Sequence, residues 1–102
     1  MESLNLDQFR WQNRIIVTYS NDPQSSKLSA FRQDIEQNTC GFKNRNLLQF
    51  HIIDKNQSEE FRVILIGKDG GVKFNGDTSL QNIFNQIDSM PMRRYEMQFD
   101  SC

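Results

Sequence analysis

Cys40, His51 and Cys102 carry the side chains of this sequence that most often take part in nucleophilic catalysis or metal binding. A disulfide framework or a zinc site needs several cysteine or histidine residues at short, regular spacing. The two cysteines are too few and too far apart for such a pattern, and His51 is the only histidine. The spacings typical of serine hydrolases and zinc peptidases are also absent. We therefore expect no metal, no other cofactor and no familiar catalytic site, and we interpret His51 as a strand residue with one ring nitrogen hydrogen-bonded.

Glycines surround a lysine in the segment 67–71, Gly-Lys-Asp-Gly-Gly, and such a backbone can bind an anion through its amide groups. A phosphate-binding loop, however, joins a strand to a helix and ends in Ser or Thr. This segment lies between two runs of strand-forming residues, 61–66 and 72–74. Because Asp69-Gly70 suits the positive φ of a tight turn, the segment predicts a β-hairpin.

Size and charge restrict the class of protein further. A chain of 102 residues is typical of one domain, which we expect to span residues 1–102 with a lead-in segment at 1–13 and a C-terminal tail at 92–102. Twelve basic and thirteen acidic residues give a net charge of −1, so we expect no nucleic-acid partner. No apolar run is long enough for a membrane span or a leader, so we expect no membrane association. The expected location is cytoplasmic if Met1 is the native start, and exported if a leader was removed.

Two kinds of hydrophobic spacing alternate along the chain. Segments rich in β-branched and aromatic residues predict strands, and the first of them is apolar on both faces, as a central strand requires. Asp22 and Pro23 predict the start of a helix that Gly41 ends, and Pro91 ends a second helix. The predicted strands are 14–19, 47–53, 61–66 and 72–74, and the helices carry the apolar stripes Leu28, Phe31, Ile35 and Leu80, Ile83, Phe84, Ile87.

Apolar side chains also occur in the two end segments. We expect Phe9 and Trp11 of the lead-in segment to cover an edge of the core. The apolar residues of the tail are available to pack back onto the domain. These tail residues are Met92, Tyr95, Met97 and Phe99.

The order of elements, strand-helix-strand-strand-strand-helix, is typical of a thioredoxin-like α/β fold. A helix between the first two strands makes them parallel, and the hairpin makes the last two antiparallel. We therefore predict a four-stranded mixed sheet with the strand order 2-1-3-4 and a helix on each face.

Three blocks of sequence occur in a characteristic order: FRWQNR at 9–14, FRVILIGKDGGVK at 61–73 and MPMRR at 90–94. Together they resemble the P-DUDES family, thioredoxin-like domains of unknown function that occur as small bacterial proteins and within vertebrate sushi-repeat and matrix proteins. The resemblance covers nearly the whole chain and implies the same fold. It also implies kinship with redox proteins and with adhesion or matrix-binding proteins, but it implies no particular reaction for this chain.

A thioredoxin-like enzyme places a nucleophilic cysteine just after the first strand, where the amino end of the first helix stabilises the thiolate. Residues 20–24 contain no cysteine, and no proline precedes Phe61, where redox members of the fold place a cis-proline. Dithiol exchange at the usual site is therefore excluded. Cys40, expected at the far end of the first helix, is the remaining candidate for a reactive thiol, and a disulfide between Cys40 and Cys102 stays open.

The predicted topology separates the charges. The loops at the carboxyl end of the first strand carry mainly carboxylates, whereas cations gather at its amino end. We therefore predict an acidic pole and a basic pole, and we expect the basic pole to bind an unknown protein or an anionic ligand. Pairing of exposed edge strands is the route to a dimer, so we expect a monomer or a weak dimer. The acidic residues are Asp22, Asp54, Glu59, Glu60 and Asp77, and the candidate binding residues are Arg14, Lys68, Arg93 and Arg94.

These observations favour a thioredoxin-like domain without the paired cysteines, which acts as a non-enzymatic binding or accessory module. The alternative is an atypical thiol oxidoreductase or a peroxidase relative that uses Cys40. The two differ in the reactivity of that thiol, because only the enzyme needs a thiol of low pKa.

Overall fold

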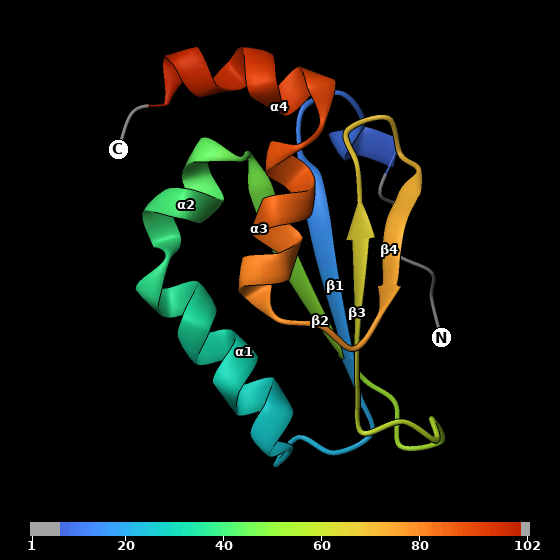
Figure 1. Ribbon diagram of the computed structural model, residues 1–102. Helices are drawn as coiled ribbons and strands as arrows, with labels where there is room; N and C mark the ends of the chain where they lie inside the picture. The colour runs from blue at the N-terminus through green and yellow to red at the C-terminus, as the bar shows by residue number, and fades with distance from the viewer. Residues whose placement is uncertain (1–6, 101–102) are drawn as a thin grey trace.

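The four predicted strands form one mixed sheet with the order β2-β1-β3-β4 (Figure 1). The computed structural model describes residues 7–100. β1 pairs parallel with β2 and antiparallel with β3, and β3 pairs antiparallel with β4. The predicted thioredoxin-like sheet order is therefore confirmed. The strands are β1 Arg14–Ser20, β2 Leu47–Ile53, β3 Phe61–Ile66 and β4 Val72–Gly76.

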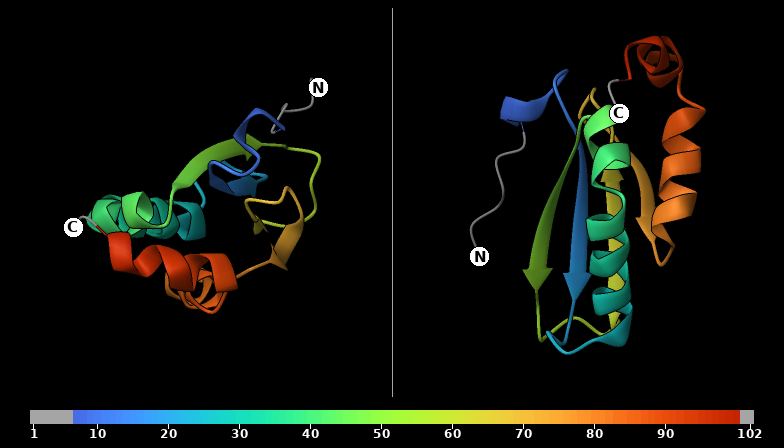
Figure 2. Two further views of the ribbon diagram at one scale, coloured as in Figure 1. Left: turned by 90° about the horizontal axis from the view of Figure 1, so that it is seen from above. Right: turned by 90° about the vertical axis from the view of Figure 1, so that its left-hand side faces the viewer.

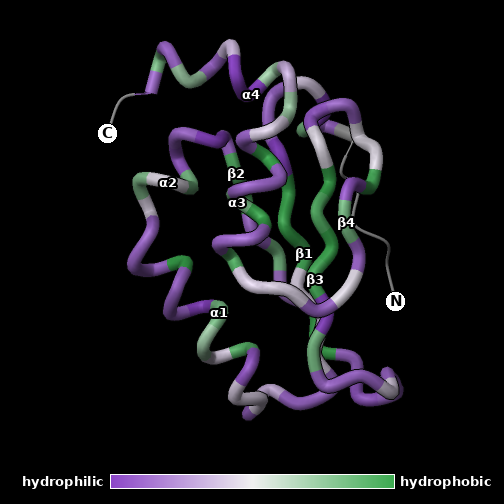
Figure 3. Tube along the Cα trace, viewed as in Figure 1, coloured by the Kyte–Doolittle hydropathy of each residue, from purple (hydrophilic) through white to green (hydrophobic). Residues whose placement is uncertain are grey.

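β1 and β3 form the middle of the sheet, and both are strongly hydrophobic (Figure 3). Ile15, Ile16 and Val17 of β1 are all buried, although they point alternately to opposite faces. β-branched side chains at successive positions suit a strand whose two faces are both covered. The prediction of a central strand at residues 14–19 is confirmed.

Two longer helices, α1 and α3, follow β1 and β4, and shorter helical elements complete the described residues. Their bounds are η1 Asp7–Phe9, α1 Ser26–Gln37, α2 Thr39–Asn44, α3 Leu80–Asp88, α4 Pro91–Glu96 and η2 Met97–Phe99.

α1 and α3 lie side by side on the same face of the sheet (Figure 2). Their buried side chains join Ile16, Val63 and Leu65 in one hydrophobic cluster. This placement differs from the predicted helix on each face. The connection between β2 and β3, residues 54–60, is polar and contains no helix that would cover the second face. On that face the lead-in segment contributes Phe9, whose ring centroid lies 5.9 Å from that of Phe50.

α1 begins at Ser26, later than the predicted start at Asp22 and Pro23. The carboxylate of Asp22 accepts a hydrogen bond from the backbone N–H of Gln24 at 2.9 Å, which makes a local turn. Ser25 is the actual cap, because its hydroxyl oxygen accepts from the backbone N–H of Leu28 at 3.3 Å. The sequence offers two capping residues three positions apart, and the second one starts the helix.

Gly41 does not end the first helix as predicted. α1 ends at Gln37, and Gly41 lies inside the following helix α2. A Cβ atom at Gly41 would lie 2.9 Å from the ring of Phe84. Gly41 is therefore needed for the close approach of α2 to α3 rather than for a helix stop.

The segment 67–71 forms the predicted hairpin turn between β3 and β4. The backbone N–H of Gly67 donates to the carbonyl of Gly71 at 2.9 Å. Gly70 adopts a φ of 85°, which agrees with the positive φ that the Asp-Gly pair predicts for a tight turn.

The C-terminal tail is helical, and Pro91 begins a helix instead of only ending one. Pro91 is the first residue of α4, where its missing N–H would have no helical partner anyway. The apolar tail residues, which were available to pack back onto the domain, stay largely at its surface. Each is more than one-third exposed: Met92, Tyr95, Met97 and Phe99.

Candidate functional site

The residues predicted for the basic pole lie together at one end of the molecule, near the amino end of β1. Arg14 is the first residue of β1, Lys68 lies in the β3–β4 turn, and Arg93 and Arg94 belong to α4. In Figure 1 this end is at the top, where α4 lies above the sheet. The structure brings the four residues to one pole, but it places them in different surroundings.

Glu96 of α4 joins two of these cations. Its carboxylate accepts hydrogen bonds from Arg14 Nη1 at 2.9 Å and from Lys68 Nζ at 2.6 Å. Burial alone would raise the pKa of Glu96, but the hydrogen bonds and charges of Arg14 and Lys68 outweigh it and hold this pKa below its ordinary value. Arg14 is itself buried, and its Nε–H has no hydrogen-bond partner among the described residues. Two of the predicted anion-binding cations therefore share one carboxylate within the protein, which offsets one of their two positive charges.

A second group of ion pairs surrounds Arg93, which is also buried. Its guanidinium donates to the two carboxylate oxygens of Asp100 at 2.6 and 2.8 Å and to Asp88 at 3.2 Å. Asp88 also accepts two hydrogen bonds from Arg45, at 3.0 and 2.8 Å. Burial would raise the pKa of Asp88, but the hydrogen bonds from Arg45 and Arg93 hold it below its ordinary value. Charged groups, rather than apolar packing, attach the C-terminal segment to the domain.

The predicted charge map omitted three carboxylates of the basic pole, Asp88, Glu96 and Asp100. A signal for two of them exists in the sequence, because Arg93, Glu96 and Asp100 stand three and four residues apart and so share one helix face. Only Arg94 among the four predicted residues is exposed. With Lys43, it is an exposed cation for which the described residues provide no ion pair.

A cleft of about 220 Å³ lies at this pole between the lead-in segment, the β3–β4 hairpin and the start of α4. Its lining combines an indole ring, two thioethers and several cations, so it can bind an apolar group with negative charges beside it. The main lining side chains are Trp11, Lys68, Lys73, Met90 and Met92.

Trp11 is the residue of this cleft that the sequence analysis assigned wrongly. It is 63% exposed instead of covering the core, and its φ of 69° is left-handed. Bulky residues rarely adopt this conformation, and strained positions cluster at binding and active sites. The backbone N–H of Trp11 donates to the carbonyl of Lys68 at 2.6 Å, which fixes the loop against the hairpin. The structure thus holds an exposed aromatic ring in place at the cleft.

Lys73 and Asp69 form an ion pair in the lining of the cleft, with 2.9 Å between Nζ and Oδ2. The hydrogen bond from Lys73, followed by one from the backbone N–H of Gly71, lowers the pKa of Asp69. Both side chains are about one-third to one-half exposed, and ion pairs in such positions are weak. Lys73 can therefore exchange Asp69 for the carboxylate of a ligand.

The amino end of α1, at the opposite pole, has no thiol. Ser25 is buried there, and its hydroxyl donates to Glu60 Oε2 at 2.8 Å. Glu60 stands directly before Phe61, where redox members of the fold place their proline. Because the hydroxyl oxygen of Ser25 also caps the helix, this pair stabilises the start of α1.

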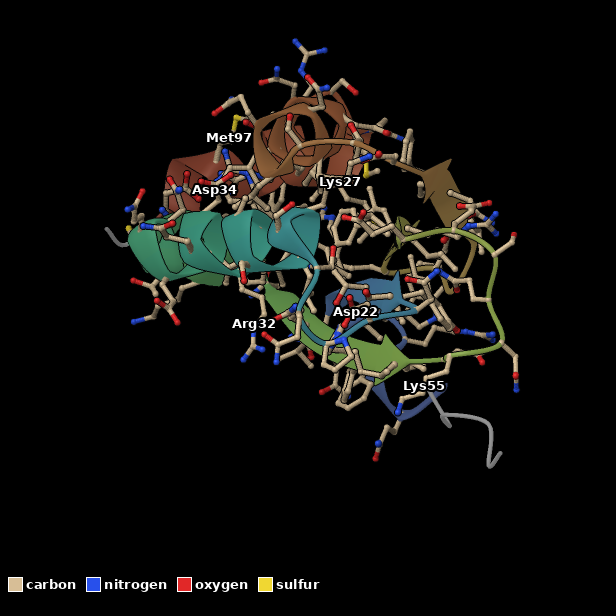
Figure 4. The ribbon with its side chains drawn as sticks, turned by 90° about the horizontal axis from the view of Figure 1, so that it is seen from below. Asp22, Lys27, Arg32, Asp34, Lys55 and Met97 are labelled. Atoms are coloured by element: carbon tan, nitrogen blue, oxygen red, sulfur yellow. The ribbon has the colours of Figure 1, made fainter. Side chains whose placement is uncertain are left out.

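The predicted acidic pole contains more cations than expected. Figure 4 shows this pole from below, with Lys27 on α1 and Lys55 on the β2–β3 loop. Lys27 pairs with Asp77 at 2.7 Å, and Arg62 pairs with Glu59. These contacts raise the pKa of Lys27 and lower that of Glu59. The carboxylates of this pole are thus partly neutralised.

Cys40 lies in the first turn of α2 rather than at the far end of the first helix. Its sulfur accepts a hydrogen bond from Asn44 Nδ2 at 3.6 Å. Within residues 7–100 there is no free thiol, and Cys102 lies outside the described residues. Because the sulfur of Cys40 is not a free thiol, the structure gives no support to thiol chemistry at this residue.

His51 has the arrangement expected of a strand histidine with one ring nitrogen hydrogen-bonded. Its Nδ1 lies 2.8 Å from the hydroxyl of Thr18 and 3.1 Å from the carbonyl of Thr18. Its buried Nε2 has no partner in the part of the chain that the structure describes. Burial lowers the pKa of His51, the carbonyl of Thr18 raises it, and the charge of Arg32 lowers it further. Figure 4 shows Arg32 on the side of α1 next to β2.

In residues 7–100, no group of three or more His, Cys, Asp or Glu side chains is placed to hold a metal ion. No helix of this range has the length and apolar composition needed to cross a membrane.

Comparison with known proteins places the chain in a family. The model of a family described as a domain of unknown function (DUF4174) matches residues 5–60 and 55–96. A search of curated proteins finds no match. Among solved structures, the chain is similar to the reduced 2-Cys peroxiredoxin of Plasmodium vivax, with 11% identity, a TM-score of 0.67, and coverage of 92% of this chain and 85% of that one. At this identity the likeness shows the fold alone. The chain is therefore a thioredoxin-like domain that belongs to the DUF4174 family of domains of unknown function.

Proposed function

We propose that this domain is a binding module and that its partner, an acidic protein or another anionic ligand, docks at the pole near the amino end of β1. The observation that carries the proposal is the strained, exposed Trp11 at a cleft lined by cations. Protein-binding surfaces are enriched in tryptophan and methionine at their centre. The three sequence blocks that resemble the P-DUDES family support the further proposal that the domain belongs with that group, whose members include parts of matrix proteins.

The charges that remain exposed define how the partner is recognised. Arg14 and Arg93 are buried in ion pairs, so they position α4 instead of meeting a partner. Arg94 and Lys43 are exposed at the same pole and supply the long-range attraction. Such attraction steers a charged partner even when the net charge is close to zero, and it weakens as salt is added.

The experiment uses Trp11 as the reporter, because it is the only tryptophan in the chain. Poly-L-glutamate titrated into the full chain is expected to give a saturable change in Trp11 emission that weakens with rising salt. The double variant Lys43→Glu with Arg94→Glu should bind about tenfold more weakly.

The control is Lys55→Glu, which reverses an exposed charge at the opposite pole. It should leave the titration unchanged. No saturable signal in the wild type, or an equal loss in the control, would overturn the proposal.

A further inference from the structure

The cleft at Trp11 has the size and lining for one large apolar side chain. Its volume is about 220 Å³, whereas an apolar cavity of about 150 Å³ already admits a benzene molecule. Trp11 offers an exposed ring face, and Met90 and Met92 add flexible thioethers that adapt to different shapes. An aromatic or leucine-sized side chain fits this lining.

The charged residues around the cleft determine which ligand residues can flank that apolar side chain. Three cations line it, Arg14, Lys68 and Lys73, against one carboxylate, Asp69. With Glu96, which pairs with Arg14 and Lys68, the group keeps one net positive charge. Arg14 is buried, and its Nη1 already donates to Glu96 and to the backbone carbonyl of Arg45. Lys68 Nζ donates to Asn46 Oδ1 at 3.0 Å and to Glu96 at 2.6 Å, which leaves one of its three protons for a ligand.

Lys73 supplies further donors from the hairpin side. Its ammonium carries three protons, and one hydrogen bond goes to Asp69. Because this exposed pair is weak, a carboxylate of a ligand can share or replace Asp69. The cleft therefore combines an apolar floor with two ammonium groups that have donors to spare.

We propose that the cleft binds a linear acidic segment of a partner protein, which seats one large apolar side chain against Trp11 and Met92 and places the adjacent carboxylates near Lys68 and Lys73. This inference rests on the proposed function and adds the chemical class of the ligand. Charge complementarity identifies the occupant, because the excess of positive charge around the cleft would repel a basic segment and attract an acidic one.

Three synthetic nine-residue peptides test the apolar anchor and the role of the ammonium groups separately. The first has a central Phe flanked by Glu residues, the second replaces the Phe by Ser, and the third keeps the Phe but replaces every Glu by Gln. We expect the first peptide to change Trp11 emission and to bind at least about tenfold more tightly than either of the others.

Each other result has a definite meaning. Equal, salt-sensitive binding of the Phe and Ser peptides overturns the apolar anchor and leaves the proposed function standing. Equal binding of the Glu and Gln peptides overturns the role of the ammonium groups. If no peptide and no poly-L-glutamate binds, both proposals fail.

Trp11→Gly tests the cleft with a variant that keeps its fold. Glycine suits the left-handed φ of 69° at this position, so the variant should unfold thermally at the same temperature as the wild type or a higher one. Its affinity for a dye-labelled Phe peptide should fall to that of the Ser peptide. Lys73→Ala should weaken the binding of the same peptide, while Lys55→Ala should leave its affinity unchanged. Unchanged binding by the folded Trp11→Gly protein would overturn the inference.

Discussion

Trp11 combines an exposed ring with a backbone conformation that costs of the order of 1 to 3 kcal/mol for a residue of its kind. The hydrogen bond from its amide to the carbonyl of Lys68 helps the surrounding structure to hold that conformation. A glycine would occupy the position without strain. A ligand that covers the ring would offset the cost by burying apolar area, which is why the strain points to binding.

His51 is the residue whose titration falls nearest to neutral pH. Burial holds its pKa below the ordinary value of 6.5, and the positive charge of Arg32 acts in the same direction. Its Nδ1 makes the contacts with Thr18 in the folded state. Protonation is therefore easier in the unfolded chain than in the folded one.

The consequence is a loss of stability on mild acidification. Because the folded pKa of His51 is the lower one, its contribution is complete above about pH 6.5 and declines as the pH falls through the folded pKa. Urea unfolding between pH 8 and pH 5 should show this decline in the wild type and not in His51→Asn. Glu96 and Asp88 do not interfere, since their lowered pKa values keep them ionised over this range. The same pH dependence in both proteins would contradict the assignment.

The C-terminal segment, α4 with η2, has the reverse of the usual distribution of polar and apolar groups. Arg93 and Glu96 face the domain, while Tyr95 and Phe99 are each about two-thirds exposed and contact each other edge to face. Ion pairs of buried groups cost desolvation and depend on every partner being present. The attachment of this segment is therefore sensitive to the loss of a single charge.

Glu96→Gln should be strongly destabilising, because it leaves the buried charge of Arg14 without its counter-ion. We expect the free energy of unfolding to fall by about 3 kcal/mol, measured by urea denaturation at pH 7. Asp77→Asn breaks the exposed pair with Lys27 and should change stability very little. Equal effects of the two substitutions would show that Glu96 does not hold the segment in place.

At the scale of the whole molecule, the main core lies on one face of the sheet. Leu65 belongs to the cluster formed with α1 and α3 and is fully buried. Its neighbour Ile64 points to the other face, which α1 and α3 do not cover, and is only half-buried. Adjacent residues of β3 therefore contribute unequally to stability.

Alanine substitutions at these two positions measure the difference. Leu65→Ala should lower the free energy of unfolding by about 3 kcal/mol, and Ile64→Ala by about 1 kcal/mol. Chemical denaturation of both variants against the wild type is sufficient. Similar losses at the two positions would mean that the second face is covered as thoroughly as the first.

The sheet was predictable because its signals are local. β-branched runs, the Asp69-Gly70 turn and one intervening helix determine the strand order without knowledge of the core. The face on which each helix lies depends on which strands the helices connect. The polar composition of the β2–β3 loop at 54–60 was the sign in the sequence that no helix covers the second face. The basic residues lie at the pole that the topology predicted, but the pairing of Arg14 and Lys68 with Glu96 arises from contacts between distant segments. The exposure of Trp11 follows from its left-handed backbone conformation, which no residue pattern in the sequence predicts.

The helix-free face created by the 54–60 connection leaves room for engineering. A short amphipathic helix grafted into this loop would extend over Ile64, beside the part of this face where Phe9 already packs against Phe50. The domain can thus be thickened on its helix-free side from the pole opposite the cleft, which makes this loop a natural insertion point for a sensor or a tether.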